Sequence, residues 1–257
     1  MNVRSIGQSL IATFLMACPF GTDTYGQTPG YVTDGSSLLW VVPQVNLRLA
    51  EEWRVISDFN WRRVLPGLDA QQDLFRAGLE RRHGGMSIAA GYAFAASHRY
   101  GPFPALSAFN EHRAWEQVAH ERTHGPWTIE HRYRLEQRWI EAFIMVEGEI
   151  VADDVAYRNR IRYRLQVRYT FLDELREPAP WSLTLSNEIF LHFLNGTQGN
   201  TFDQDRIAMY VARKISSTFT ARVGALEQII VRAGYTEINT AVTLGLVIDL
   251  DFSSRED

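Results

Sequence analysis

The stretch from Tyr157 to Phe171 reads YRNRIRYRLQVRYTF, and its alternation of residue types decides the fold class. Arginine stands at positions 158, 160, 162, 164 and 168, whereas the odd-numbered positions from 157 to 171 are apolar or aromatic except for Asn159. Successive side chains of a strand point to opposite faces, while a helix would scatter these residues around its surface. We therefore predict a long β-strand with one charged face and one apolar face.

The segments from Trp127 to Arg138 and from Trp181 to Phe193 show the same period of two. Similar alternation elsewhere predicts eleven strands of roughly ten to twelve residues, longer than usual in soluble proteins and close to a tilted membrane strand. The strands begin near Leu38, Trp53, Leu74, Met86, Glu111, Trp127, Tyr157, Trp181, Arg206, Thr218 and Val242.

A weaker alternation between Trp139 and Val151 predicts one further strand. Because bacterial single-chain barrels have even strand numbers, we predict an all-β, antiparallel, up-and-down barrel of twelve strands, with ten as the alternative. Short connections at residues 50–52, 83–85 and 214–216 alternate with long ones at 95–108, 195–203 and 229–240. Short turns on one side and long loops on the other are typical of barrels that span a membrane.

The N-terminus has the features of a secretory signal. Arg4 precedes an apolar run from Leu10 to Phe20, and small residues follow at 24–26. We predict a signal peptide at residues 1–26 and a barrel domain at residues 27–257. The single cysteine, Cys18, lies in the apolar run. Cys18 is either removed with the signal peptide or is the cysteine that accepts the lipid of a lipoprotein.

Alternation alone is consistent with two kinds of fold, which differ in whether the charged face points outward or inward. In a soluble barrel or sandwich the arginines meet water, whereas in a membrane barrel they face the lumen. Export, aromatic residues near strand ends and a terminal-strand pattern at 243–252 favour the membrane. An arginine facing lipid at the midplane costs roughly 2–4 kcal/mol, so we expect the arginine face to be inside.

Five motifs give the chain a resemblance to the DUF2490 family, which comprises exported bacterial proteins of unknown function thought to form outer-membrane barrels. They are EHRAWEQ at 111–117, HRYRLEQR at 131–138, RIRYRL at 160–165, NEIF at 187–190 and FDQDR at 202–206. The resemblance covers nearly all of the exported chain, although Asp205 stands where asparagine is expected. It implies the outer membrane of a Gram-negative bacterium and supplies no catalytic residues.

The polar faces of these strands predict a charged lumen. Its expected members are Glu111, Arg113, Gln117, Glu130, Arg132, Arg134, Glu136, Arg138, Arg158, Arg160, Arg162, Arg164, Arg168, Glu188 and Arg206. Two interpretations remain open. The ion pairs hold a narrow barrel shut and rigid, or the excess of arginine makes a porin-like pore or binding site for small anionic solutes.

A specific register follows if the strands from Trp127 and from Tyr157 are antiparallel neighbours joined by a centred connection. It pairs Glu136 with Arg158 and Glu130 with Arg164. The arginine at 134 would then oppose the one at 160, and the arginine at 132 the one at 162. We expect Glu111 and Glu188 to neutralise this central group.

Two other classes of function remain open. An outer-membrane lipid-modifying hydrolase would need a serine–histidine pair at the rim, but Ser186 and His192 are six positions apart, or about 20 Å. A soluble periplasmic binding protein would place the arginines in water. We predict no catalytic residue, metal or cofactor. The expected partners are outer-membrane lipids, the barrel-assembly machinery through the C-terminal strand, and a small anionic solute. A net charge of -4 gives no reason to expect nucleic acid.

Overall fold

A computed structural model describes residues 32–171, 181–193, 201–232 and 234–253. Every regular element in these ranges is a β-strand. No helix among the described residues is long and apolar enough to cross a membrane. The predicted signal peptide at residues 1–26 and its cleavage site lie outside the described residues, as does most of the long connection predicted at 195–203.

The strands are long, and most have twelve to seventeen residues. Their bounds are β1 Val32–Asp34, β2 Ser37–Arg48, β3 Trp53–Val64, β4 Asp69–His83, β5 Met86–Ser97, β6 Phe109–His124, β7 Trp127–Ile140, β8 Phe143–Val146, β9 Glu149–Ala152, β10 Ala156–Thr170, β11 Trp181–Phe193, β12 Phe202–Lys214, β13 Phe219–Arg232 and β14 Tyr235–Asp251. The eleven long strands are those predicted from the alternation, although β4, β12 and β14 begin four to seven residues earlier than expected.

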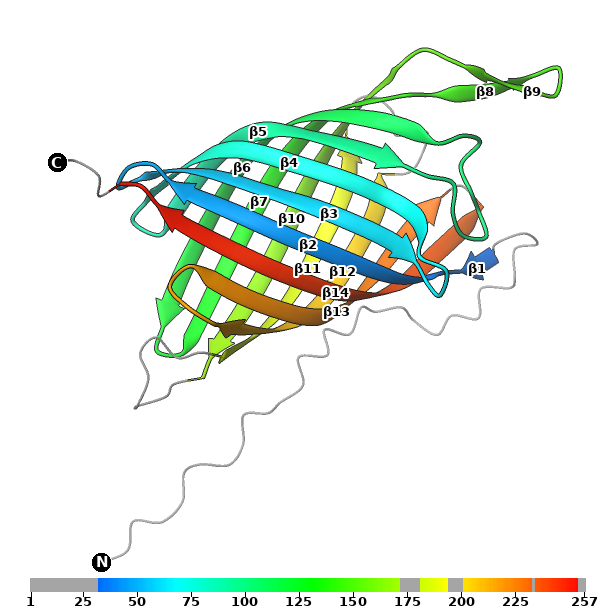
Figure 1. Ribbon diagram of the computed structural model, residues 1–257. Coiled ribbons are helices and arrows are strands. Elements are labelled where there is room, and N and C mark those ends of the chain that lie inside the picture. The colour runs from blue at the N-terminus through cyan, green and yellow to red at the C-terminus, as the bar shows by residue number, and fades with distance from the viewer. Residues whose placement is uncertain (1–31, 172–180, 194–200, 233, 254–257) are drawn as a thin grey trace, which may run out of the picture. The chain divides into compact units, whose positions relative to one another are not determined.

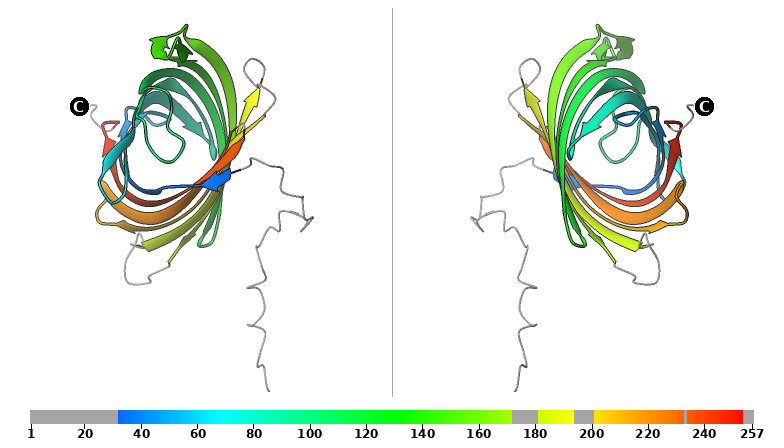
Figure 2. Two further views of the ribbon diagram at one scale, coloured as in Figure 1. Left: turned by 90° about the vertical axis from the view of Figure 1, so that its right-hand side faces the viewer. Right: turned by 90° about the vertical axis from the view of Figure 1, so that its left-hand side faces the viewer.

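The main sheet contains twelve strands and closes into a barrel (Figures 1 and 2). Strands that follow one another along the chain pair antiparallel, and β7 pairs with β10. Eleven strands make the wall, so the last strand runs in the same direction as the first. The seam between β14 and β2 is therefore parallel, with Thr240 opposite Ser37 and Asp251 opposite Arg48. The short β1 extends the same parallel pairing.

The barrel class is confirmed, but the additional strand is not where the sequence analysis placed it. Residues 143–152 fold back on themselves as the β8–β9 hairpin, a separate two-stranded sheet that projects beyond the barrel (Figure 1). Its turn residues, Glu147 and Gly148, have φ of 52° and 89°. Two consecutive residues with positive φ are typical of a two-residue hairpin turn, so this dipeptide interrupts the strand that we predicted.

The two ends of the barrel differ in their connections. Turns at 49–52, 84–85 and 125–126 mark one end, which we call the short-turn end. The connections at 98–108 and 141–155 mark the opposite, long-loop end. The long loop predicted at 229–240 is wrong, because β13 continues to Arg232 and β14 begins at Tyr235.

The charged face is inside the barrel and the apolar face is outside. On β10, Arg160 and Arg162 are 4% and 3% exposed, whereas Ile161 between them is 36% exposed. Large apolar side chains are exposed around the wall: Phe59, Phe75, Leu79, Ile88, Val118, Ile129, Leu185, Ile207, Met209, Val223, Val242 and Leu244. This arrangement is the inverse of a soluble barrel, which buries its apolar face.

Candidate functional site

A continuous chain of ion pairs crosses β7, β10 and β11 in the lumen. Glu136 accepts hydrogen bonds from Arg160 at 2.8 Å and 2.5 Å and from Arg162 at 2.6 Å. Arg162 also reaches Glu188 at 2.8 Å, and Arg132 binds the same carboxylate at 2.5 Å. Because each carboxylate is shared by two guanidinium groups, the five side chains form a single network rather than separate pairs.

The register between β7 and β10 differs from our prediction by two residues. Glu136 lies opposite Arg160, and Arg158 lies opposite Arg138, so the predicted pair of Glu136 with Arg158 is wrong. The error came from the assumption that one centred connection joins the strands, whereas Ile140 pairs directly with Ala156 and the hairpin lies between them. Glu188 neutralises the central arginines, as we expected.

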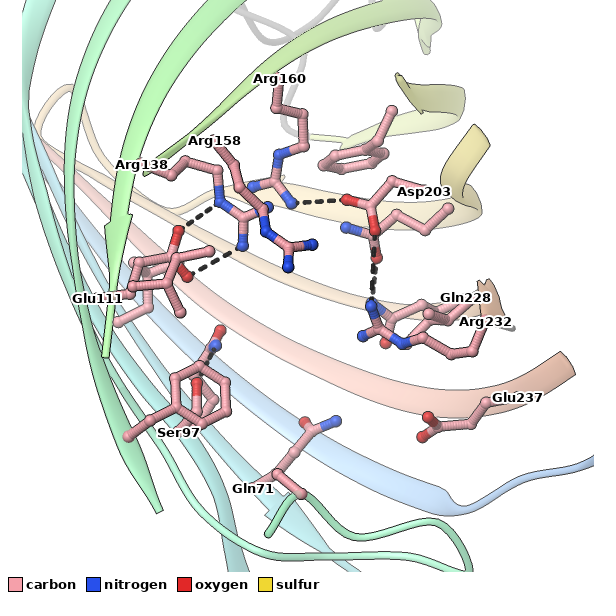
Figure 3. A pocket seen from close by; sticks show the side chains of 18 of the residues that line it. Gln71, Ser97, Glu111, Arg138, Arg158, Arg160, Asp203, Gln228, Arg232 and Glu237 are labelled. Carbon is pink, nitrogen blue, oxygen red and sulfur yellow. Dashed lines mark hydrogen bonds and ion pairs between the residues drawn. The ribbon is translucent and has the colours of Figure 1, made fainter. Parts of the chain in front are cut away.

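A second cluster lies closer to the long-loop end. Glu111, which is 1% exposed, accepts hydrogen bonds from Arg113 at 2.7 Å and 2.8 Å, and from Arg138 (Figure 3). The expectation that Glu111 neutralises arginines 132, 134, 160 or 162 is therefore not met by these contacts. Its partners come from its own strand and from the neighbouring β7.

Asp203 joins the network from β12 and was missed by the sequence analysis. It is the additional residue of a β-bulge, because Gln204 pairs with Phe190 and Phe202 with Leu191. A bulge redirects a side chain, and both Asp203 and Gln204 are buried. The Asp203 carboxylate accepts a hydrogen bond from Arg160 at 2.9 Å and lies 3.4 Å from the His192 ring (Figure 3).

The other predicted lumen residues have weaker partners or none among the described residues. Arg134 donates to the neutral Gln117, and Arg168 lies 3.4 Å from Glu121. Arg158 projects into the lumen with no ion pair in the described part of the chain (Figure 3). Arg206 likewise has no carboxylate partner within the described ranges.

The predicted contact between Glu130 and Arg164 does form, although the two residues are not directly opposite. Arg164 lies opposite Arg132, and Glu130 lies opposite Gln166. The ion pair therefore runs diagonally between β7 and β10. The long arginine side chain reaches across the shift of two residues.

An ion pair between Asp58 of β3 and Arg76 of β4 was also missed. Arg76 donates three hydrogen bonds to the Asp58 carboxylate at 2.9–3.1 Å. Both residues stand at inward positions that alternate with Phe59 and Phe75. The alternation of β3 and β4 could have identified them, but the charges of β4 are divided between its two faces, whereas those of β7 and β10 lie on one face.

A column of stacked arginines and aromatic rings spans the lumen. Its order is Arg62, Trp40, Arg206, Phe190 and Arg162. The guanidinium carbons of Arg62 and Arg206 lie 4.0 Å and 5.2 Å from the Trp40 ring centre, and those of Arg206 and Arg162 lie 4.7 Å and 4.4 Å from the Phe190 ring centre. Because β3 and β10 are on opposite sides of the eleven-stranded wall, the column crosses the barrel. Trp40, which the sequence analysis did not assign to either face, is an inward residue.

A third inward ring, Trp115, occupies space left by two glycines. Gly78 and Gly91 lie opposite each other on β4 and β5. A Cβ atom at either position would come within 2.6 Å of the Trp115 ring. The indole therefore packs against bare backbone, and its ring centre lies 4.6 Å from the guanidinium carbon of Arg134.

Three cavities divide the lumen. The outer cavity, at the long-loop end, has a volume of about 450 Å³. Two further cavities of about 300 Å³ each extend toward the short-turn end: the middle cavity, lined mostly by β10–β14, and the inner cavity, lined mostly by β2–β7. Arg76 lines all three, whereas Arg62 and Arg206 line the outer and middle cavities. The side chains of the column thus stand at the junction between the outer and middle cavities.

The loop from 98 to 108 contributes to the mouth of the outer cavity. Tyr100 and Phe103 line it, and the Phe103 ring stacks on Tyr235 with the ring centres 4.1 Å apart. Burial, together with the negative charge of Glu237, raises the pKa of Tyr100 to about 12. Its hydroxyl therefore stays protonated and remains a hydrogen-bond donor at the mouth.

The histidines do not form a catalytic arrangement with serine in the described residues. His112 and His131 face outward and bond the hydroxyls of Tyr92 and Tyr163 at 2.5 Å and 2.9 Å. Among the residues whose placement is described, no serine hydroxyl is bonded to a histidine ring, and no group of three metal-binding side chains occurs.

Comparison with known proteins identifies a family and similar solved structures. The family described as "Protein of unknown function (DUF2490)" matches residues 38–239. No curated protein matches the chain. A solved structure described as "NanC porin structure in rhombohedral crystal form" is similar to 75% of this chain and 81% of that one, with 11% identity and a TM-score of 0.44.

Proposed function

The chain belongs to the DUF2490 family, and from the geometry of its barrel we propose that it is an outer-membrane protein whose lumen binds and passes small anions. The family description gives no function. The proposal therefore rests on the two faces of the wall and on the charge balance of the cavities.

The outer face supports a position in a membrane. Soluble monomers rarely expose continuous apolar surface of more than a few hundred Å², yet apolar side chains are exposed on strand after strand here. Aromatic residues lie at both ends of this band. Trp139 and Tyr157 pair near the long-loop end, whereas Trp127 and Tyr169 pair near the short-turn end, as in an interfacial girdle.

The excess of arginine around the cavities is the observation that carries the proposal. Nine arginines and four carboxylates line the outer cavity. The inner cavity has seven arginines and three carboxylates, and the middle cavity has eight arginines with Glu188 as its one carboxylate among the described residues. Rings of arginine select anions in pores because cations are repelled and anions are attracted. The same sign of net charge around all three cavities favours anions over cations in the lumen.

Ion selectivity tests the proposal. The refolded protein, inserted in a planar bilayer under an asymmetric KCl gradient, should give a reversal potential of the sign that chloride dictates. Arg158→Gln should move that potential toward zero, because Arg158 lines the outer cavity without an ion-pair partner among the described residues. Arg81→Gln removes the same charge from an outward residue that pairs with Glu52, and should leave the potential unchanged. A cation-selective current would contradict the proposal.

A closed structural barrel is the second candidate. The shared carboxylates of Glu136 and Glu188 and the stacked column favour it, because such contacts hold the side chains across the lumen. In this case the inserted protein gives no current. A closed barrel remains compatible with solute binding in the outer cavity, so binding and conduction need separate measurements.

A further inference from the structure

Arg62 and Arg206 share with Arg134 the lack of an ion pair among the described residues, which separates these three from the other buried arginines of the lumen. Arg62 donates to two neutral amides, Gln72 at 2.8 Å and Asn60 at 3.4 Å, and Arg206 donates to Gln204 at 3.3 Å. Neither has an ion pair in the part of the chain that the structure describes. Arg160, at a comparable depth, binds both Glu136 and Asp203. Two positive charges therefore stand in the lumen without an ion pair from the described residues, although Glu188 lies opposite Arg206 across the β11–β12 pair.

The two guanidinium groups are neighbours. Both stack on the ring of Trp40, at 4.0 Å and 5.2 Å from its centre. Their carbon atoms thus lie no farther apart than the sum of these distances. Both side chains line the outer cavity and the middle cavity. An anion that binds both groups beside the edge of the Trp40 ring would therefore sit where the two cavities meet.

Each of the two arginines also has an unused donor. The Nε atoms of Arg62 and of Arg206 are buried without a hydrogen-bond partner. Arg62 is only 6% exposed. An uncompensated charge in such a position is unfavourable unless a counter-ion or a hydrogen-bond acceptor occupies the adjacent space. The cavities provide that space, and an anion there would supply both the acceptor and the opposite charge.

We propose that Arg62 and Arg206 form an oxyanion site at the junction of the outer and middle cavities, which holds the carboxylate or phosphate group of a small solute. The planar guanidinium fork matches two oxygens of such a group and binds it more specifically than it binds chloride. Trp40, Ala208 and Leu226 belong to one apolar cluster and line the middle cavity, where they would contact a nonpolar part of the solute. This inference rests on the proposed function only in that the lumen admits anions.

Calorimetric titration of the refolded full-length protein in detergent tests the site, with inorganic phosphate and acetate as separate probes. Arg62→Gln and Arg206→Gln should each weaken binding by at least about tenfold, because each removes charged hydrogen bonds to the anion. Arg62→Lys keeps the charge but loses the fork, and should restore only part of the affinity. Arg81→Gln is the matched control, since Arg81 faces outward and pairs with Glu52, and its affinity should equal that of the wild type.

The outcomes separate the site from the proposed function. Equal affinity of wild type, Arg62→Gln and Arg206→Gln for both probes would overturn the site even if the bilayer current is anion-selective. Loss of binding in these variants supports the site even if no current flows. Preference for phosphate or for acetate identifies the solute group.

A second measurement covers variants that fail to refold. Phosphate or acetate should raise the unfolding temperature of the wild type in proportion to its saturation. Chloride at the same ionic strength should not. An equal effect of the three anions would overturn the site.

Discussion

Glu136→Gln should be among the most destabilising single changes in the lumen. Glu136 is 1% exposed and accepts three hydrogen bonds from two buried arginines. Glutamine retains one oxygen acceptor, but the N–H donors of its amide group would face the N–H donors of the arginines. Removing one partner of a buried ion pair costs about 3–5 kcal/mol. We expect the lower end, about 3 kcal/mol, because Arg160 keeps Asp203 and Arg162 keeps Glu188.

The assay is equilibrium unfolding in urea of the protein refolded in lipid vesicles. Glu121→Gln is the control, because the side chain of Glu121 is a lumen carboxylate that is 36% exposed and lies 3.4 Å from Arg168. Its loss should cost no more than about 1 kcal/mol. Equal losses of stability for Glu136→Gln and Glu121→Gln would refute the network.

A double-mutant cycle then tests the register. Glu136→Gln and Arg160→Gln should couple by about 1 kcal/mol or more, because the residues are in contact. Glu136→Gln and Arg158→Gln should be additive within about 0.5 kcal/mol. The opposite order of coupling would restore the register predicted from a centred connection.

Three further predictions concern the wall. Leu165→Arg should impair assembly in lipid, since an outward arginine costs roughly 2–4 kcal/mol at the midplane, whereas Gln166→Arg, on the lumen side, should be tolerated; equal heat-modifiable migration of the two would argue against the face assignment. Deletion of residues 244–257 removes most of the seam with β2 and should abolish heat-modifiable migration, because lipid cannot satisfy an open edge; normal insertion of the truncated chain would show that the seam is misassigned. Replacement of residues 143–152 by a short glycine–serine linker should leave migration and stability unchanged, because β8 and β9 pair only with each other; loss of assembly would place the hairpin in the barrel.

The barrel could be predicted from the sequence because each wall strand has two chemically different faces. Period-two alternation is a local property, and it located eleven strands and the direction of their charged faces. The closing strand was recognisable for the same reason. The parallel pairing of this strand with β2 could not be recognised locally, since it depends on whether the total number of strands in the wall is odd or even. The turn at Glu147 and Gly148 was the sequence signal for the separate β8–β9 hairpin. Because this hairpin keeps residues 143–152 out of the wall, the number of wall strands is odd.

The contacts within the lumen were harder to predict. Ion pairs depend on register, and an error of two residues replaced Arg160 by Arg158 as the partner of Glu136. Asp203 turns inward because of a bulge, which alternation does not reveal. Trp40, Trp115 and Phe190 were not expected inside, because aromatic residues on a strand can face lipid as well as arginine. Their inward position depends on packing between side chains of distant strands, which local alternation does not describe.

The arrangement of the two faces in a bilayer is the central claim, and spin labelling of β10 tests it most directly. The only cysteine of the chain is Cys18, so single cysteines at residues 163–168 can be labelled once Cys18 is replaced. In vesicles, labels at 163, 165 and 167 should collide mainly with oxygen, which concentrates in lipid. Labels at 164, 166 and 168 should collide mainly with a water-soluble nickel complex. The inverse pattern, or uniform access of the nickel complex at all six positions, would contradict a membrane barrel with an arginine-lined lumen.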